Sequence, residues 1–299
     1  MRHLILYAIL LFVLLCPFTG QAQDGLKIYI SVDMEGVVGA VTGDQLGPGG
    51  FEYQRFREIM TNETNAAIEA AYEAGATEIL VSDSHGNGQN LLIDRLPRNI
   101  QVIRSWPRQF GMMAGIDETF DGVIFIGYHA STTNPEGVRA HTISSARLAA
   151  VRLNGTEMPE AGINAAVAGH FNVPVIMISG DDAAVQEAQD LIGGIEGAVV
   201  KWANSFHSAR SLHPEDAYDL IRQKVKAAIG RIGELKPYKL QTPVTLEVTF
   251  KHYRPSQVLT FLPIVERIDA HSIRFTGKDM VETSDFLTFL TSYNVALEP

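Results

Sequence analysis

The sequence predicts an α/β fold, with a mostly parallel sheet covered by helices on both faces and a smaller α+β C-terminal part. In the first two-thirds of the chain, continuous apolar strand-like segments alternate with helix-like segments, which is typical of a parallel sheet buried between two layers. After Pro237 and Pro243 the pattern changes to alternation of apolar and polar residues. We therefore expect a larger α/β part over residues 23–204 and the smaller part over residues 205–299.

The first elements follow from local patterns of apolar residues. Leu26–Val32 alternates and is expected to be a strand, whereas Phe51–Ala74 places alanines and polar residues on different sides and is expected to be a helix. Short apolar segments then predict three more strands, at Glu78–Ser82, Gln101–Ile103 and Val123–Ile126.

The alternation continues through the middle of the chain. Ala149–Leu153 is expected to be a strand and Glu160–Gly169 a helix. The wholly apolar Val173–Ile178 predicts another strand, and Ala183–Ile192 another helix. The pair Asp181-Asp182 stands just before that helix, where an aspartate is a favoured N-cap.

Three elements are expected in the last third. A helix from Pro214 to Ile232 is indicated because proline is favoured in the first turn of a helix. Val244–Phe250 alternates apolar and polar residues and predicts a strand, and Phe286–Val295 predicts the last helix.

Residues 1–22 have the pattern of a secretory signal peptide. The apolar run Leu4–Leu15 is too short for a stable membrane span, and Gly20-Gln21-Ala22 fits a cleavage site. We expect a secreted protein that resides in the periplasm after cleavage. One alternative is an uncleaved N-terminal anchor. A second is a lipid anchor on Cys16, although the residue before it, Leu15, is bulky where a small residue is usual.

Composition narrows the chemistry. The chain has 24 basic and 34 acidic residues and no basic run, which argues against a nucleic-acid partner. Its one cysteine, Cys16, lies in the signal segment, so the mature protein has no disulfide and no thiolate. Any metal must then be held by His, Asp and Glu. No other segment is long and apolar enough to span a membrane.

Potential ligands follow three of the expected strands. SVDMEG places Asp33 and Glu35 after the first strand, SDSHG places His85 after the second, and GYHA places His129 after the third. Since the carboxyl ends of parallel strands share one edge of a sheet, these side chains are expected to meet there.

The residue types in this group favour a metal. Two imidazoles and two carboxylates suit zinc, manganese or iron, and a cation would relieve the repulsion between Asp33 and Glu35. Glu160, at the start of the next helix, adds a third carboxylate. Five such ligands are too many for one tetrahedral ion and suit two ions that share a bridging carboxylate.

Each residue also has a purely structural interpretation. Asp33 and Glu35 fit a turn with solvated acids, and Asp83 fits an N-cap of the turn that follows it. His129 fits a hydrogen-bonded core histidine, and Glu160 fits a first-turn residue stabilised by the helix dipole. The metal interpretation rests on the convergence of several strand ends.

His141 lies twelve residues after His129 in a loop rich in Gly, Ser and Thr. A histidine that lies near a metal without binding it is suited to act as a general base or nucleophile. On its own, the residue is better described as an ordinary loop histidine.

The motifs SVDMEG, DSHG, GYHA, AHT and PEAGINA occur in this order and at spacings that resemble those of the zinc-dependent D-aminopeptidases of the DppA type. The resemblance extends to VPVIMISGDD and FTGKDMVE and so covers most of the mature chain. It departs from the family in the N-terminal signal.

This resemblance implies a site and an activity. Two Zn²⁺ per subunit would be bound by five residues, with the first as the bridge: Asp33, Glu35, His85, His129 and Glu160. His141 falls at the position of the catalytic nucleophile, and Asn164 is expected to help position substrate. The family implies hydrolysis of short peptides with a free N-terminal D-amino acid, such as D-Ala-D-Ala, by a ring-like homo-oligomer of stacked pentamers.

Three alternatives stay open at this stage. The same metal site suits another metal-dependent amidohydrolase or peptidase. A signal peptide followed by an α/β fold also suits a non-catalytic periplasmic solute-binding protein. The third alternative is a ring-forming structural protein in which the metal only stabilises the fold.

Overall fold

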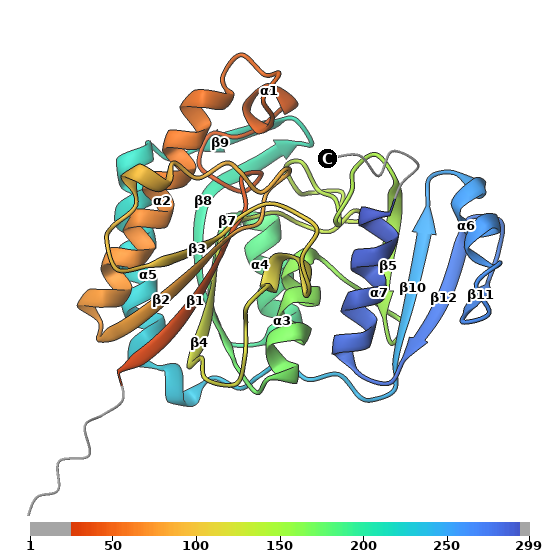
Figure 1. Cartoon of the computed structure of the whole chain (residues 1–299). Coiled ribbons are helices and arrows are strands. Elements are labelled where there is room, and N and C mark those ends of the chain that lie inside the picture. The colour runs from red at the N-terminus through yellow and green to blue at the C-terminus, as the bar shows by residue number, and fades with distance from the viewer. Residues whose placement is uncertain (1–24, 294–299) are drawn as a thin grey trace, which may run out of the picture.

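The computed structural model describes residues 25–293 (Figure 1). The expected signal peptide and the expected end of the last helix at Val295 lie outside this range. Within it, no helix is both long and apolar enough to cross a bilayer.

The larger sheet confirms the α/β prediction. Its seven strands run in the order β3-β2-β1-β4-β7-β8-β9, and all neighbours are parallel except β8 and β9. Its strands are β1 (Leu26–Val32), β2 (Ala76–Asp83), β3 (Gln101–Ile103), β4 (Gly122–Tyr128), β7 (Val175–Asp181), β8 (Glu196–Ser205) and β9 (Ser208–Ser211). The first of these has the bounds that its alternation predicted, whereas the long β8 was not predicted.

Side-chain alternation along β1 divides the core into two layers. Ile28 and Ile30 point to the layer formed with α2 (Tyr53–Glu73) and α5 (Pro214–Gly230), which pack against each other. Tyr29 points to the opposite layer, which includes α3 (Glu160–His170) and α4 (Asp182–Ile192). Helices therefore lie on both faces of the sheet, as predicted (Figure 1).

A second, antiparallel sheet lies beside the first. Its five strands run in the order β11-β12-β10-β5-β6. They are β5 (Leu148–Leu153), β6 (Thr156–Glu157), β10 (Val244–Phe250), β11 (Val265–Arg267) and β12 (Ser272–Gly277). The last long helix, α7 (Met280–Ser292), packs against this sheet on one side and against α3 on the other, so it connects the two parts (Figure 1).

The structure corrects two element predictions. The strand expected at Ala149–Leu153 exists, but it belongs to the antiparallel sheet, because β5 pairs with β10 through Val151 and Val248. The last helix begins at Met280 rather than Phe286, since the Asp279 side chain accepts a hydrogen bond from the Glu282 amide and caps it.

The remaining helices are short. The short helices are α1 (Gly43–Leu46), α6 (Tyr253–Leu259) and the 3₁₀ turns Ile93–Arg95, Gly111–Met113 and Ile232–Glu234.

The division of the chain near residue 204 remains a prediction. Elements from both sides of this residue contribute to both parts, because β5 and β6 join the smaller sheet and α5 packs on the larger one.

Candidate metal centre and active site

The expected ligands meet at the carboxyl edge of the parallel sheet. β1 lies between β2 and β4, so the segments that follow these three strands are neighbours. Asp33 follows β1 directly, His85 comes two residues after β2, and His129 follows β4. Glu160 reaches the same place from the first turn of α3. All are buried.

Asp33 lies between two histidines. Its Oδ1 is 3.0 Å from His85 Nδ1, and its Oδ2 is 3.2 Å from His129 Nε2. Glu35 approaches the same His85 nitrogen, with Oε2 at 2.7 Å. Because its two oxygens face different imidazoles, Asp33 has the arrangement of a carboxylate that bridges two cations.

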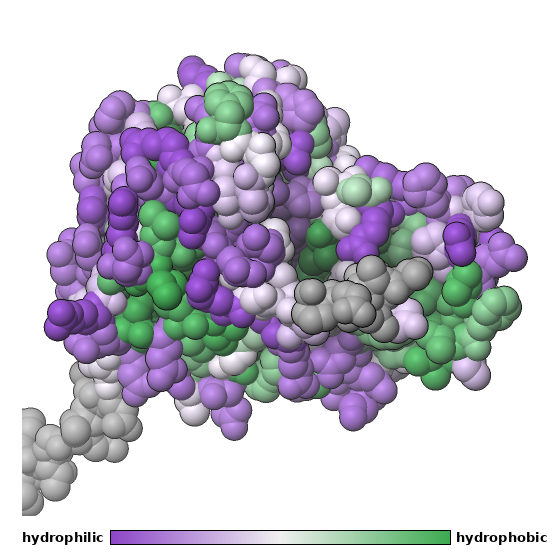
Figure 2. Space-filling view, turned by 45° about the horizontal axis from the view of Figure 1, so that its top comes forward, coloured by the Kyte–Doolittle hydropathy of each residue, from purple (hydrophilic) through white to green (hydrophobic). Residues whose placement is uncertain are grey.

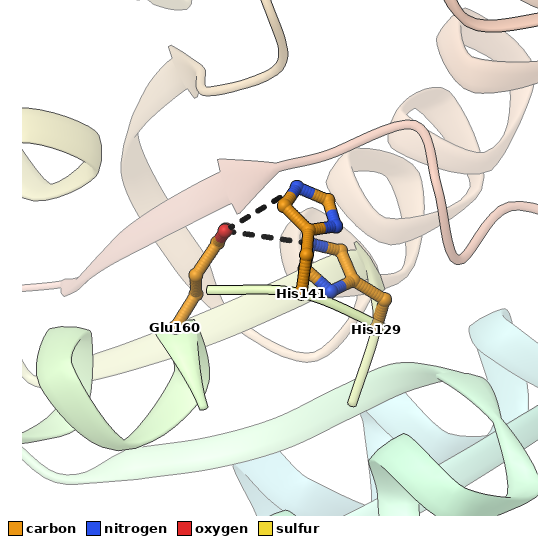
Figure 3. A group of neighbouring side chains, drawn as sticks. All are labelled: His129, His141 and Glu160. Atoms are coloured by element: carbon orange, nitrogen blue, oxygen red, sulfur yellow. Dashed lines mark ion pairs between the residues drawn. The ribbon is translucent and has the colours of Figure 1, made fainter. Parts of the chain in front are cut away.

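His141 and Glu160 complete the cluster (Figure 3). Glu160 Oε1 is 3.5 Å from His129 Nε2 and 3.8 Å from His141 Nε2. The imidazole rings of His129 and His141 are nearly parallel, with centroids 4.0 Å apart and an angle of 8° between their planes. His141 Nε2 is also 4.0 Å from Glu35 Oε1, so it faces both carboxylates.

Backbone carbonyls fix the orientation of all three rings. His85 Nε2 donates to the Leu46 carbonyl at 2.6 Å, His129 Nδ1 to that of Ala130 at 3.0 Å, and His141 Nδ1 to that of Arg139 at 2.8 Å. Each outer nitrogen must carry a proton to donate, so each neutral ring presents a lone pair on its other nitrogen to the cluster. This is how metal-binding histidines are commonly held.

The donor set fits a divalent cation. Asp33 Oδ2 and His129 Nε2 are fully buried and have no hydrogen-bond partner among the described residues, although they face each other. A carboxylate oxygen and an imidazole lone pair repel each other unless a proton or a cation lies between them, and unsatisfied buried polar atoms are rare. Two overlapping groups have ligand atoms within 4.8 Å of one another: Asp33, Glu35 and His129, and His129, His141 and Glu160. Nitrogen and oxygen donors of this kind suit zinc.

Electrostatics point the same way. Burial raises the pKa of Asp33, and the charge of Glu35 adds to that rise. Burial alone would lower the pKa of His129, but the charges of Glu160 and Asp33 hold it well above its usual value. The pKa of His85 is likewise well raised, because Glu35 and Asp33 outweigh its burial. Without a metal, protons on these imidazoles balance the carboxylates, and metal binding must displace them.

Two buried residues that the sequence did not indicate bind the backbone of the loop after β1. Lys201, in β8, is fully buried and donates to the carbonyls of Glu35 at 2.5 Å, Val37 at 3.1 Å and Ala40 at 2.6 Å. Glu63, in α2, accepts from the Val38 amide at 2.8 Å. Neither residue lies in a recognisable motif. They fix the backbone that carries Glu35.

Close backbone packing explains the glycine of the first motif. A Cβ on Gly36 would lie 1.9 Å from the Tyr128 carbonyl oxygen, so no other residue fits there without displacement of the backbone. The Gly36 amide donates to the Gly127 carbonyl at 2.7 Å, which ties the loop after β1 to the end of β4.

Asn164 lies on α3 beside the cluster. Its Nδ2 donates to the Tyr128 hydroxyl at 2.9 Å, and that hydroxyl is 2.7 Å from Ser31 Oγ. The side chain is buried and also lines the cavity described next. Its expected role in positioning substrate stays a prediction. Asp83, by contrast, accepts from the Asn90 and Leu91 amides and shapes the loop that carries His85.

A cavity of about 570 Å³ opens onto the cluster. Asp33, Glu35, His85, His141 and Glu160 form one part of its wall, and side chains of α7, among them Leu287 and Thr291, form another. Figure 2 shows a hollow between the larger and the smaller part of the molecule. This volume is in the range of small-molecule sites and has room for a short peptide.

Known proteins resemble this chain over most of its length. Residues 26–289 match the M55 peptidase family, which is described as D-aminopeptidase. The chain is 34% identical over 270 residues to the D-aminopeptidase of Bacillus subtilis (strain 168), covering 89% of this chain and 97% of the relative. It also resembles the solved structure of the Zn-dependent D-aminopeptidase DppA from Bacillus subtilis, a self-compartmentalizing protease. The TM-score is 0.86 at 34% identity, over 89% of this chain and 97% of that one.

Proposed function

Because this chain belongs to the M55 family of D-aminopeptidases and is a metallo-aminopeptidase, we propose that it holds two zinc ions and releases an N-terminal D-amino acid from short peptides such as D-Ala-D-Ala. The observation that carries the proposal is the position of Asp33, whose two oxygens face different histidines. The family match covers nearly all of the described chain, so a solute-binding or purely structural role is not favoured.

The two zinc ions would share Asp33. One would be held with Glu35 and His85, which lie on the Oδ1 side, and the other with His129 and Glu160, which lie on the Oδ2 side. Each group has nitrogen and oxygen donors and leaves coordination positions for substrate, as catalytic zinc sites do. When bound, zinc supplies Lewis-acid activation of the scissile carbonyl and of the attacking nucleophile.

We assign the proton transfers to His141. Its Nδ1 is engaged with the Arg139 carbonyl, so Nε2 presents a lone pair to the cluster and to the cavity. As a general base, this nitrogen accepts a proton from the attacking water and passes it to the leaving amine. As a nucleophile, it would form an acyl-imidazole that water then hydrolyses, and the leaving amine would take its proton from solvent. The free amino terminus of the peptide would lie against the carboxylates of the cluster, which explains removal of terminal rather than internal residues.

Self-association is also proposed. The Bacillus subtilis relative is described as self-compartmentalizing, and this chain exposes an apolar patch of its own. The patch lies on α6, on the segment between α6 and β11 and directly after β11, at the edge of the smaller part that is furthest right in Figure 2. Its members are Tyr253, Val258, Phe261, Ile264 and Ile268. Apolar patches of this kind mark contact surfaces, so the patch supports self-association. From the resemblance to the family, we propose a ring-like homo-oligomer of stacked pentamers that encloses the active sites.

The place of action follows from the sequence of residues 1–22. We propose that the segment directs secretion and that the mature enzyme meets short D-peptides in the periplasm. N-terminal sequencing of the exported protein would show a start near Gln23, and retention of Met1 on an exported, membrane-bound chain would contradict cleavage.

The central test compares substrates. Purified protein loaded with zinc is expected to release D-alanine from D-Ala-D-Ala, to act poorly on L-Ala-L-Ala, and to leave N-acetyl-D-Ala-D-Ala intact. Elemental analysis of the same sample is expected to give two zinc ions per subunit. No release from D-Ala-D-Ala by protein that contains two zinc ions would refute the substrate assignment while leaving the metal assignment in place.

A further inference from the structure

One lining residue of the active-site cavity differs in charge from all others. Asp33, Glu35 and Glu160 contribute negative charge at the cluster, and most of the remaining wall is neutral. Among the lining residues in the described part of the chain, Arg147 is the one permanent cation. It comes from the loop that also carries His141.

The guanidinium of Arg147 is held in place without being neutralised. Its Nε donates to Ser144 Oγ at 3.3 Å, and one terminal nitrogen donates to the Thr291 carbonyl in the last turn of α7 at 2.9 Å. Between residues 25 and 293, no carboxylate lies within 4.0 Å of it, whereas Arg152 nearby in β5 pairs with Glu157 at 3.0 Å. Five N–H groups surround a guanidinium, so donors remain for a carboxylate, which arginine binds through two parallel hydrogen bonds.

The reach of the loop sets the length of peptide that fits. The Ile143 amide donates to Glu160 Oε1 at 2.7 Å, which ties the start of the loop to the cluster. Arg147 is four residues further along, so its Cα lies at most about 14 Å from that of Ile143. The backbone between them turns, since the Leu148 amide donates to the Ser144 carbonyl at 3.0 Å. An extended residue spans about 3.5 Å, so about four extended residues would match this upper limit, and the turn makes the span from the cluster to the Arg147 backbone shorter than that.

We propose that Arg147 binds the C-terminal carboxylate of the substrate, and that the enzyme therefore acts on dipeptides and tripeptides with both ends free. This inference rests on the proposed peptidase function. The metal cluster accepts the amino end, as a free amine beside the carboxylates or on the metal, and the cation at the other part of the wall accepts the carboxyl end. The cavity thus holds a partner for each end of a short peptide, and the charge complementarity at the carboxyl end contributes to specificity.

The test varies the substrate and the residue together. Wild type is expected to hydrolyse D-Ala-D-Ala with a kcat/KM about 10- to 100-fold above that of D-Ala-D-Ala amide, the size of one lost charge-assisted contact, mainly through KM. Arg147→Met is expected to lower this preference towards one, and Arg147→Lys to retain part of it. Arg152→Met, which removes an arginine outside the cavity, is the matched control and is expected to keep the full preference.

Each result decides between the proposals. Equal hydrolysis of the acid and the amide by wild type would overturn the role of Arg147 and leave the peptidase function intact. A preference that survives in folded Arg147→Met, as judged by its thermal unfolding, would overturn it too. Hydrolysis of neither peptide by zinc-loaded wild type would overturn the proposed function itself, and this inference with it.

Discussion

The Glu63→Gln variant tests how the loop that carries Glu35 is supported. Glu63 is fully buried; its Oε1 accepts from the Val38 amide, and its Oε2 has no hydrogen-bond partner in the described structure. Burial raises the pKa of Glu63 from 4.5 to about 7, against the opposing effects of the Val38 hydrogen bond and the charge of Lys201. Glutamine keeps the acceptor for Val38 and cannot ionise.

The size and sign of the effect follow from this pKa. Since the folded pKa lies above the unfolded one, the folded state binds the proton more tightly, so the stability that this proton contributes is present below pH 4.5 and is lost as the pH rises through 7. A difference of about 2.5 pKa units corresponds to roughly 3 kcal/mol in total, of which about 2.5 kcal/mol falls between pH 5 and pH 8. Because its glutamine cannot ionise, Glu63→Gln does not lose this free energy of unfolding as the pH rises.

Urea unfolding at a fixed protein and zinc concentration measures the effect. The free energy of unfolding of Glu63→Gln minus that of wild type is expected to rise by about 2.5 kcal/mol from pH 5 to pH 8. Titrating groups that do not interact with Glu63 contribute equally to both proteins and cancel, whereas Lys201, whose pKa burial lowers to about 8 against the raising effect of the Glu63 charge, does not cancel at the upper end of this pH range. Glu69→Gln, at an exposed glutamate on the same helix, is the control and should show no such rise. Parallel stability curves for Glu63→Gln and wild type would refute a buried, ionising Glu63.

Three further predictions concern the metal, the chemistry and the assembly. Chelation should abolish activity and lower the unfolding temperature, and zinc affinity measured by competition should rise with pH because His85 and His129 have raised pKa values; an affinity independent of pH would contradict them as ligands. His141→Ala should lose about 10³-fold or more in kcat while elemental analysis finds its zinc retained, whereas His129→Ala should lose zinc as well; near-normal turnover of His141→Ala would contradict its role. Phe261→Asp should lower the molar mass measured by light scattering, and an unchanged mass would place the interface elsewhere.

The sequence was sufficient to predict where the site lies. Parallel strands bring their carboxyl ends to one edge, so Asp33, Glu35, His85 and His129 could be grouped although they are far apart in the chain. The structure brings them together with Glu160 and His141. Their roles as ligands and catalyst stay predictions, because proximity alone does not separate a ligand from a neighbouring base.

Elements whose partners are distant were harder to predict. The apolar pattern of β5 shows that it is a strand but not that its partner is β10, about a hundred residues later. Lys201 could not be identified as a support of the metal loop, because its partners are backbone carbonyls, which leave no trace in the sequence. The role of Arg147 could be inferred only from the cavity, because the sequence does not show that Arg147 and α7 line the same cavity.

The balance of charge at the cluster supports the proposal of two ions rather than one. Asp33, Glu35 and Glu160 are all at most 6% exposed, so together they place three negative charges where water screens them poorly. The imidazoles are neutral when they act as ligands. One divalent ion would leave one negative charge in excess, whereas two leave one positive charge. Because negative charge develops on the oxygen of the scissile carbonyl during hydrolysis, a site with a positive excess stabilises the transition state more than the substrate, which is the requirement for catalysis.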